Sequence, residues 1–339
     1  MAVLAIVVVG VLIALGVALR RPEAAPAAGT FPDPVAVPST TTRLASSGSA
    51  RATAWILPSY GGPRDVLVDA TGTVWLSEAD AGVISAFRAG SLTRYQLGRV
   101  FAGAGTFRIG TGENGDVWFT SYPDGSVGRI LPNGSANVFA PFAQGQSSAS
   151  IVRADDGSMW VTDPARGMLL RIGADGIATQ IAAPGVGPHP YDAVALGGSI
   201  WFTDPSGTSI GRLDPSTGQI EQIRVGAAAR SIAAAPDGTL WVTRSKARTV
   251  VRVDPGTGAT NEVPVAADGA LNDVAVAPDG TLWLTQEAPF VLHLSATGAL
   301  LDRVRLPGGA RFADGIAIDA DGVAWAATVS GNSLVEIHP

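Results

Sequence analysis

Seven tryptophans at a nearly constant spacing constrain this 339-residue chain more than any other feature. They lie 40 to 43 residues apart, and a glycine stands three residues before each of them. The seven are Trp75, Trp118, Trp160, Trp201, Trp241, Trp283 and Trp325. A repeat of this length that contains several short strands is typical of a β-propeller, with one blade for each copy. We therefore predict an all-β fold, a seven-bladed β-propeller.

Each copy predicts a four-stranded antiparallel blade. An alternating run such as 273–276 leads into an Asp-Gly pair. We interpret this pair as a two-residue hairpin turn, because such a turn needs positive φ and Asp-Gly is a favoured sequence for it. The tryptophan strand follows, then a third strand such as 209–213, a second glycine turn and a fourth strand such as 219–223. We expect each tryptophan ring to fill the space between neighbouring blades.

The last copy is incomplete, because the chain ends at Pro339 before its fourth strand. Residues 52–58 form an additional strand ahead of the first copy, and this strand contains an eighth tryptophan, Trp55. We predict that the N-terminal strand completes the last blade, since such closure leaves no unpaired sheet edge where the two ends meet.

The residues before the repeats predict a targeting segment followed by a linker. Residues 1–21 are a signal anchor or a signal peptide, with an apolar run over 2–19 that is at the lower limit for a spanning helix. Cleavage at the small residues 25–27 is the alternative to an anchor. Residues 22–51 are a Pro/Ala/Ser/Thr-rich linker, and residues 52–339 form the propeller.

We expect the propeller to be membrane-anchored through the N-terminal helix and extracytoplasmic, or secreted if the signal is cleaved. The linker favours this side of the membrane, whereas the arginines at 20 and 21 favour the opposite orientation. The net charge of −6 argues against a nucleic-acid partner. The absence of cysteine excludes disulfides, zinc-thiolate sites and a thiol nucleophile. The expected partner is a small molecule or a protein or peptide segment, and we expect a monomer.

Propeller geometry places a candidate ligand site at one mouth of the central channel. The innermost strands begin there, and the loops that follow the tryptophan strands surround the same mouth. A concave mouth with convergent polar groups predicts a binding site. The alternative is that the mouth is polar only because it is exposed to solvent. The candidate ligand-binding residues are Arg64, Asp65, Arg108, Tyr191, Asp192, Arg230, Asn272, Asp273, Gln286 and Asp314.

Three carboxylates of the third and fourth blades raise the question of a metal. Asp163, Asp192 and Asp204 have the oxygen ligands that Ca²⁺ or Mg²⁺ prefers. We expect these side chains instead to pair with arginines across the channel, so no metal site is assigned from the residues. The same arginines suit an anionic ligand through bidentate hydrogen bonds.

His189 is a candidate general base near the mouth. Its ordinary pKa suits proton transfer near neutral pH. The alternative is a structural loop histidine, because it lies between Pro188 and Pro190. The catalytic residues are therefore unknown at this stage.

Two segments carry a family resemblance. The sequences over 116–120 with 128–130, and over 201–204 with 210–215, resemble those of the streptogramin (virginiamycin B) lyases, and the similarity extends over about residues 52–339. The resemblance implies seven blades. It also implies, for members with the full catalytic set, a Mg²⁺-assisted elimination that opens a cyclic depsipeptide at its ester bond.

The catalytic set implied by the resemblance is not conserved in residue type here. Those lyases have histidines where the fifth and sixth inner strands begin and a glutamate after the sixth tryptophan strand. The matching residues are Arg230, Asn272 and Gln286, and none of these can act as a base at neutral pH. Glu287 is one residue further along and is a second weak candidate for the base.

Three functions stay open from the sequence. The leading hypothesis is a tethered propeller that binds a ligand at its mouth without the lyase reaction. The alternative is a lyase or lactonase-like enzyme that opens a cyclic ester with Mg²⁺ or Ca²⁺, using His189 or Glu287. The third is a purely structural interaction module. A cofactor is unknown, and Mg²⁺ is expected only in a lyase.

Overall fold

The computed structural model describes residues 29–30, 42–45, 51–97, 105–122, 125–139, 147–173, 178–182 and 189–339. The apolar segment expected as a helix, residues 2–19, lies outside these ranges. Within them, no helix is both long enough and apolar enough to cross a membrane.

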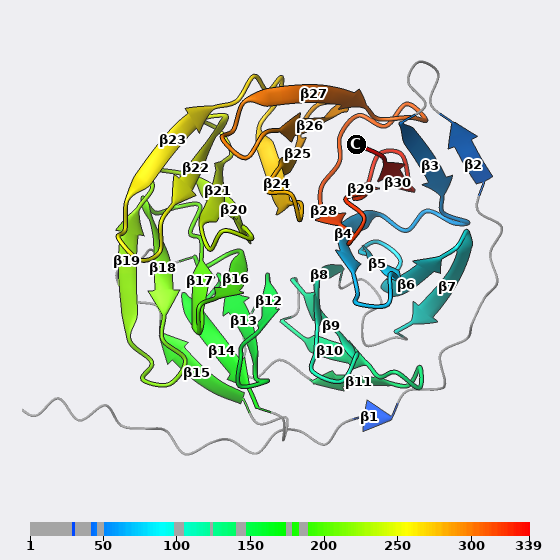
Figure 1. Ribbon diagram of the computed structural model, residues 1–339. Helices are drawn as coiled ribbons and strands as arrows, with labels where there is room; N and C mark the ends of the chain where they lie inside the picture. The colour runs from blue at the N-terminus through cyan, green and yellow to red at the C-terminus, as the bar shows by residue number, and fades with distance from the viewer. Residues whose placement is uncertain are drawn as a thin grey trace, which may run out of the picture.

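Seven antiparallel sheets surround a central axis, which confirms the predicted seven-bladed propeller (Figure 1). Blades 1 and 2 contain β4 (Pro63–Val68), β5 (Val74–Glu78), β6 (Val83–Arg88) and β7 (Ser91–Gln96), then β8 (Thr106–Thr111), β9 (Val117–Ser121), β10 (Val127–Ile130) and β11 (Ala136–Phe139). Blades 3 and 4 contain β12 (Ile151–Arg153), β13 (Met159–Asp163), β14 (Met168–Ile172) and β15 (Ala178–Ala182), then β16 (Ala193–Leu196), β17 (Ser199–Phe202), β18 (Ser209–Leu213) and β19 (Ile220–Arg224). Blades 5 and 6 contain β20 (Ala229–Ala234), β21 (Leu240–Arg244), β22 (Thr249–Val253) and β23 (Thr260–Pro264), then β24 (Leu271–Val276), β25 (Leu282–Gln286), β26 (Phe290–Leu294) and β27 (Leu300–Arg305).

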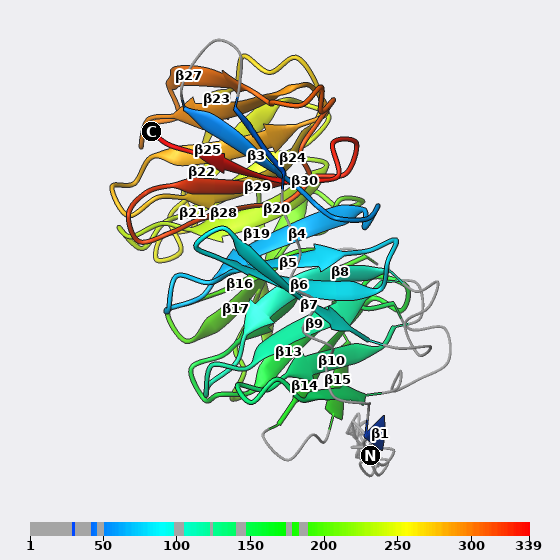
Figure 2. The same cartoon turned by 90° about the vertical axis from the view of Figure 1, so that its right-hand side faces the viewer.

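Blade 7 joins the two ends of the propeller. It contains β28 (Ile316–Ile318), β29 (Ala324–Thr328), β30 (Ser333–Ile337) and the N-terminal strand β3 (Ala52–Ile56). Strand β3 pairs antiparallel with β30, with Ala52 opposite Ile337, and Figure 2 shows the two strands side by side. The Trp55 indole donates a hydrogen bond to Glu336 at 3.0 Å. The predicted closure is therefore confirmed.

Two short strands of the segment expected as a linker add to blade edges. Strand β2 (Thr42–Ala45) pairs with β3 on the outside of blade 7. Strand β1 (Gly29–Thr30) pairs with β11 of blade 2. The two blades that receive them therefore have five strands each.

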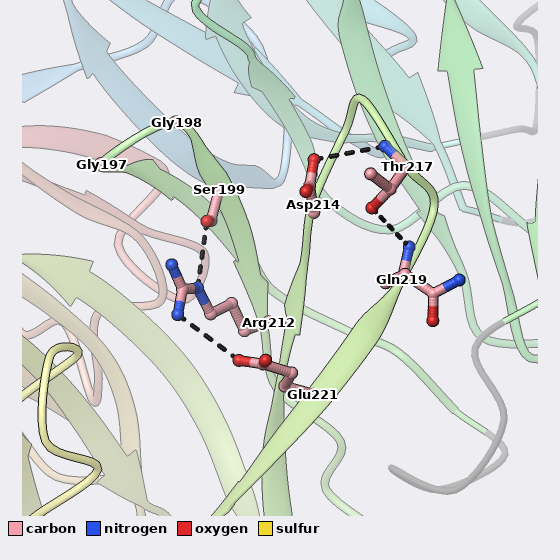
Figure 3. A pocket seen from close by; sticks show the side chains of 8 residues that line it. All are labelled: Gly197, Gly198, Ser199, Arg212, Asp214, Thr217, Gln219 and Glu221. Atoms are coloured by element: carbon pink, nitrogen blue, oxygen red, sulfur yellow. Dashed lines mark hydrogen bonds and ion pairs between the residues drawn. The ribbon is translucent and has the colours of Figure 1, made fainter.

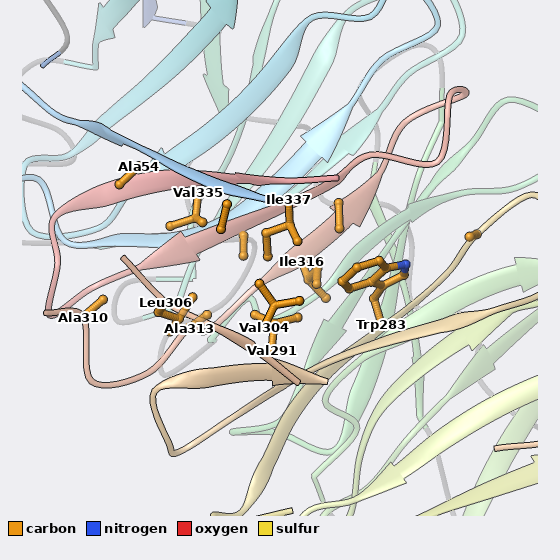
Figure 4. Packing of buried hydrophobic residues seen from close by; sticks show 14 residues of the cluster. Ala54, Trp283, Val291, Val304, Leu306, Ala310, Ala313, Ile316, Val335 and Ile337 are labelled. Atoms are coloured by element: carbon orange, nitrogen blue, oxygen red, sulfur yellow. The ribbon is translucent and has the colours of Figure 1, made fainter. Parts of the chain in front are cut away.

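The repeated tryptophans pack each blade against the next, as predicted. Trp160 of blade 3 is 1% exposed and belongs to a buried cluster with Ile200, Phe202 and Leu213 of blade 4. Trp283 of blade 6 contributes in the same way to the cluster of blade 7, which also contains residues of β3 and β30 (Figure 4). Large rings at one phase of the second strand thus fill the gaps between the sheets.

The turns at the Asp-Gly positions differ from the two-residue hairpins expected. In blade 5 the turn has three residues, 236–238, and the amide of Ala235 donates to the carbonyl of Thr239 at 2.8 Å. Only Gly238 has positive φ, at 81°. Asp237 is placed there because its carboxylate accepts the backbone N–H of Thr239 at 3.0 Å, which is a side-chain cap of the turn.

Blade 4 is the exception with a two-residue hairpin. Leu196 pairs with Ser199, and the two residues between them, Gly197 and Gly198, have φ values of 59° and 73°. Glycine adopts such values without steric cost, so this sequence selects the shorter turn.

Candidate functional site

A β-bulge at the start of the inner strands brings two consecutive side chains to the channel. In blade 1, Pro63 pairs with Glu78 and Val66 pairs with Leu76, so that Arg64 and Asp65 together oppose Ser77. Blades 2, 5 and 6 show the same shift of register. A regular strand would turn alternate side chains to opposite faces, whereas a bulge re-aims one of them.

The second residues of these pairs, together with Asp192 of blade 4, form a buried layer below the mouth. Arg108, the second residue of the pair in blade 2, lies at its centre. The Nη1 atom of Arg108 lies 2.9 Å from Asp65 Oδ1 and 2.9 Å from Asp273 Oδ2. Its Nη2 atom lies 3.9 Å from Asp192 Oδ2. One guanidinium of blade 2 therefore bridges carboxylates of blades 1, 4 and 6 across the channel. The ion pairing predicted for Asp192 is present in this cluster.

Burial and the surplus of negative charge set the ionisation of this cluster. Desolvation raises the pKa of Asp65 to about 6, even though Arg108 acts in the opposite direction. The neighbouring Asp273 adds to the increase in the Asp65 pKa. Burial would lower the pKa of Arg108, but the surrounding carboxylates raise it well above its ordinary value, so that Arg108 stays charged.

The same carboxylates hold neighbouring inner strands together. Asp65 accepts the backbone N–H of Ile109 at 2.9 Å, and Asp192 accepts that of Ile232 at 3.0 Å. These hydrogen bonds join blade 1 to blade 2 and blade 4 to blade 5. The buried layer is therefore both charged and structural.

Arg64 and Arg230, the first residues of the pairs in blades 1 and 5, form the mouth together with Asp314 of blade 7. Arg64 Nη1 lies 3.2 Å from Asp314 Oδ2, and Arg230 Nη2 lies 3.9 Å from Asp314 Oδ1. The side chains of Arg64 and Arg230 are 37% and 33% exposed, so both can be reached by a ligand. Two arginines that share one carboxylate leave hydrogen-bond donors for an acceptor or an anion.

Aromatic rings complete one side of the mouth. The guanidinium of Arg230 lies over Tyr191, 5.5 Å from the ring centroid. Phe107 lies between Tyr191 and Tyr122, with centroid distances of 6.1 and 5.3 Å. Tyr122 is 40% exposed and was not predicted. Its position four residues after Trp118, among the residues that follow the tryptophan strand, is a signal by which the sequence shows it.

The structure does not bring Gln286 to the mouth. This side chain is fully buried, accepts the backbone N–H groups of Asp268 and Gly269 at 2.8 and 3.1 Å, and donates to the carbonyl of Phe290. It stands three residues after a tryptophan and so on the opposite face of the sheet from that ring. Its role in the fold is to hold a loop.

Asp163 and Asp204 occupy the same position in blades 3 and 4 and are likewise fully buried. Asp163 accepts the backbone N–H of Ser147 at 3.1 Å, and Asp204 accepts that of His189 at 2.8 Å. Asp192 lies in the channel layer instead. Among the residues in the described ranges, no three or more His, Asp or Glu side chains are grouped to hold a metal ion.

The two candidate bases are both on the surface. Glu287 is exposed and its backbone N–H donates to the carbonyl of Ala270. His189 is exposed, and its Nδ1 atom lies 2.7 Å from the carbonyl oxygen of Pro164. A carbonyl can only accept, so this contact selects the tautomer with hydrogen on Nδ1 and leaves Nε2 able to take a proton.

The residues present do not fit the Mg²⁺ site that the resemblance implies. Arg230 brings a positive charge to one of the three key positions. Asn272 is 5% exposed and its amide donates to the carbonyl of Ala313 at 3.0 Å, while Gln286 is engaged in its loop. A cation and two amides already in hydrogen bonds are a poor donor set for a hard cation, which prefers carboxylates.

Sequence reasoning missed a belt of hydroxyl groups two residues after the tryptophans. Thr162 accepts the backbone N–H of Ser150 in its own blade at 2.9 Å and donates to the carbonyl of Tyr191 in the next blade at 2.7 Å. Thr120 and Thr203 make the same pair of contacts. Six of the seven copies have Ser or Thr here, so the signal was in the sequence.

The fold and the site together define a seven-bladed propeller with a charged and aromatic mouth above a buried arginine cluster. The sequence matches the virginiamycin B lyase family over residues 53–229 and 193–339. The chain belongs to this family.

A curated relative also belongs to this class of protein. A virginiamycin B lyase of Nocardia farcinica is 29% identical over 180 residues, which are 52% of this chain and 61% of that protein. The chain thus matches less than two thirds of the length of this curated relative.

Two solved structures show the same fold. One is a catalytically inactive His→Ala variant of virginiamycin B lyase from Staphylococcus aureus with quinupristin, which has a TM-score of 0.80, 21% identity and coverage of 85% of this chain and 99% of that one. The other is a putative gluconolactonase with a TM-score of 0.55, 18% identity and coverage of 86% and 93%.

Proposed function

We propose that this protein binds a ligand at the channel mouth and does not open a cyclic ester by the lyase reaction. The ligand is a small molecule or a protein segment with an apolar or aromatic face and at least one hydrogen-bond acceptor. One observation carries the proposal. Arg230 lies over Tyr191 and beside Asp314, at the position where the family resemblance requires a histidine.

The related lyase structure supports the emphasis on histidine. The Staphylococcus aureus lyase with a His→Ala substitution is described as catalytically inactive. The present mouth has a guanidinium and an amide at the matching positions, and neither group accepts a proton at neutral pH. The rings of Phe107, Tyr122 and Tyr191 provide a surface on which an apolar ligand can pack.

Quinupristin is the probe for this proposal. We expect calorimetric titration to detect binding, and mass spectrometry after incubation with Mg²⁺ to find the compound without ring opening. Tyr191→Ala and Arg230→Ala should each weaken binding by about tenfold or more, because each removes a central contact. Arg224→Ala, an exposed change at the end of β19, is the matched control. A Mg²⁺-dependent opened product would overturn the proposal.

An enzyme that uses His189 is the second candidate function. The hydrogen bond from Nδ1 to Pro164 leaves Nε2 of an exposed imidazole free to accept a proton, which is what a general base needs. Ring opening that is lost in His189→Ala, with Glu287→Gln as the parallel test of the other candidate, would establish this function.

We also propose that the apolar segment over residues 2–19 tethers the propeller outside the membrane. The support is its length and composition, followed by a segment rich in Pro, Ala, Ser and Thr. Protease added to intact cells should then degrade the propeller. Protection in intact cells, with degradation only after lysis, would contradict an extracytoplasmic location.

A further inference from the structure

A polar hollow in blade 4 lies on the face opposite the mouth. It has a volume of about 500 Å³ and opens between the hairpin 197–198 and the turn that connects β18 to β19 (Figure 3). Ser199, Arg212, Thr217 and Glu221 contribute to its wall. Every lining residue is polar or glycine, so hydrogen-bonding groups surround the hollow.

The neighbouring blades explain why the hollow exists. In blade 3, Arg171 pairs with the turn residue Asp156 at 2.7 Å, and in blade 5 Arg252 pairs with Asp237 at 2.6 Å. Arg212 has the equivalent position, opposite Trp201, but the turn of blade 4 is the short Gly197-Gly198 hairpin and provides no carboxylate. A Cβ atom built on Gly197 would meet nothing within 4 Å.

Arg212 is held in place but keeps donors for a ligand. Its guanidinium lies over Trp201, 5.4 Å from the ring centroid, and its Nε donates to Ser199 at 3.1 Å. Its Nη1 donates to Glu221 at 3.4 Å. These contacts use two of the five N–H donors of a guanidinium. The Glu221 side chain is 73% exposed, so its carboxylate can accept further hydrogen bonds.

The charges of the wall select the chemistry of the occupant. Hydrogen bonds from Ser216, together with those from Thr217, lower the pKa of Asp214 to about 2, so this carboxylate is ionised at every ordinary pH. With Glu221 it outnumbers the one guanidinium, which disfavours an anion. Hydroxyl groups both donate and accept, and therefore match a wall of carboxylates, guanidinium, amide and hydroxyls.

We propose that this hollow, which we call the blade-4 pocket, binds a neutral polyhydroxyl ligand, such as the terminal sugars of an oligosaccharide. Arg212 and Glu221 donate to and accept from adjacent hydroxyl groups of one sugar. The glycine hairpin lets the ring approach the backbone closely. This site is separate from the mouth and does not depend on the function proposed there.

The test replaces the short turn by the longer one of the next blade. Substituting Pro-Asp-Gly for Gly197-Gly198 restores the three-residue turn, and its aspartate should pair with Arg212 and fill the pocket. Cellobiose, maltose and chitobiose are the probes, and binding to the full chain is followed through the amide resonances of Thr217 and Gln219, which line the pocket and are kept in every variant. We expect saturable shifts with at least one disaccharide, a loss of affinity of at least tenfold in the turn replacement, and an unchanged or higher Tm.

A second variant keeps the test independent of the turn. Arg212→Gln should also weaken binding at least tenfold, whereas Arg252→Gln, the matched change in blade 5, should leave it unchanged. The proposal is overturned if none of the three disaccharides binds up to 100-fold excess, or if the turn replacement and Arg212→Gln both bind as tightly as the parent protein. Shifts produced by Ca²⁺ or by an acidic sugar alone would also overturn it. Tyr191→Ala tests the mouth and should not affect this binding.

Discussion

Arg108 is the residue on which the channel layer depends. It neutralises part of the charge of Asp65, Asp192 and Asp273, which lie on three different blades. Buried carboxylates without a partner are costly, and breaking a buried ion pair by removing one member is more harmful than replacing both. The position is therefore far more sensitive than a surface arginine.

Arg108→Met should lower the free energy of unfolding by about 3–5 kcal/mol, because three buried carboxylates lose their counter-ion. Urea unfolding measures the change. Arg88→Met, at the exposed end of β6, is the control and should change stability by about 0.5 kcal/mol or less. Equal effects of the two substitutions would show that the cluster has no special weight in the fold.

Asp65 should make stability depend on pH between about 4 and about 6. Its folded-state pKa of about 6 is above the ordinary 3.8, so the folded form holds the proton more tightly than the unfolded one. Its contribution is complete below pH 4 and is lost as the pH rises through 6, with a maximum of about 3 kcal/mol. The free energy of unfolding, measured by urea at several pH values between 4 and 6, should depend less on pH in Asp65→Asn than in the parent.

Asp214→Asn is the control for this pH dependence. The Asp214 pKa is lowered, so its contribution changes below pH 4 and not between 4 and 6. A parent-like slope in Asp65→Asn would mean that Asp65 does not titrate in this range.

At the scale of elements, the bulged inner strands and the hydroxyl belt form one repeated unit. In blades 1, 2, 5 and 6 the bulge is opposite the Ser or Thr two residues after the tryptophan. In blade 1 this hydroxyl, on Ser77, accepts the backbone N–H of Asp65 in the bulge and donates to the carbonyl of Phe107 in the next blade. In blade 7 the position is Ala327, and the backbone N–H of Gly315 instead donates to the carbonyl of Arg64 at 2.8 Å. The junction of blades 7 and 1 is therefore held without a hydroxyl.

Thr162→Val should lower the free energy of unfolding by about 1–3 kcal/mol. Valine keeps the shape of threonine, but the buried N–H of Ser150 and the carbonyl of Tyr191 lose their hydrogen-bond partner. Thermal or urea unfolding measures the loss. Thr260→Val is the control, since Thr260 is exposed on the outer strand β23 and should tolerate the change. A neutral Thr162→Val would show that water replaces the hydroxyl.

The sequence was sufficient to predict the blades, their number, the tryptophan packing and the closure, because these follow from a repeat seen seven times. It also identified Arg64, Asp65, Arg108, Asp192, Arg230 and Asp314 as channel residues. It was not sufficient to place Gln286, because this residue ends β25 and tertiary packing brings to its side chain the loop amides of Asp268 and Gly269. The aromatic contact of Tyr122 with Phe107 and the blade-4 pocket arise from tertiary packing and from a one-residue difference in turn length, which no periodicity reveals.

At the scale of the whole molecule, one strand pair closes the ring. Ala54 of β3 is fully buried in the cluster that joins blades 6 and 7, and β3 covers the edge of β30. Without it, blade 7 would have an unpaired edge and an open apolar surface.

Removing residues 1–58 should therefore lower the Tm and broaden the transition relative to the parent, whereas removing residues 1–50 should leave both nearly unchanged. Calorimetry and the urea m-value measure these effects, since m reports the surface exposed on unfolding. A transition as late and as cooperative after removal of residues 1–58 would contradict the role of β3 in the ring.

The pairing of β3 with β30 also sets the order of events during synthesis. Trp55 and Glu336, which are hydrogen-bonded in the native protein, are 281 residues apart in the chain. While the ribosome is at work, the edge of β3 that pairs with β30 has no partner until almost the last residue has been synthesised. Contacts of such long separation form slowly, so the newly made protein spends an interval with an exposed β-edge. In that interval the chain is most prone to aggregate or to be captured by a chaperone.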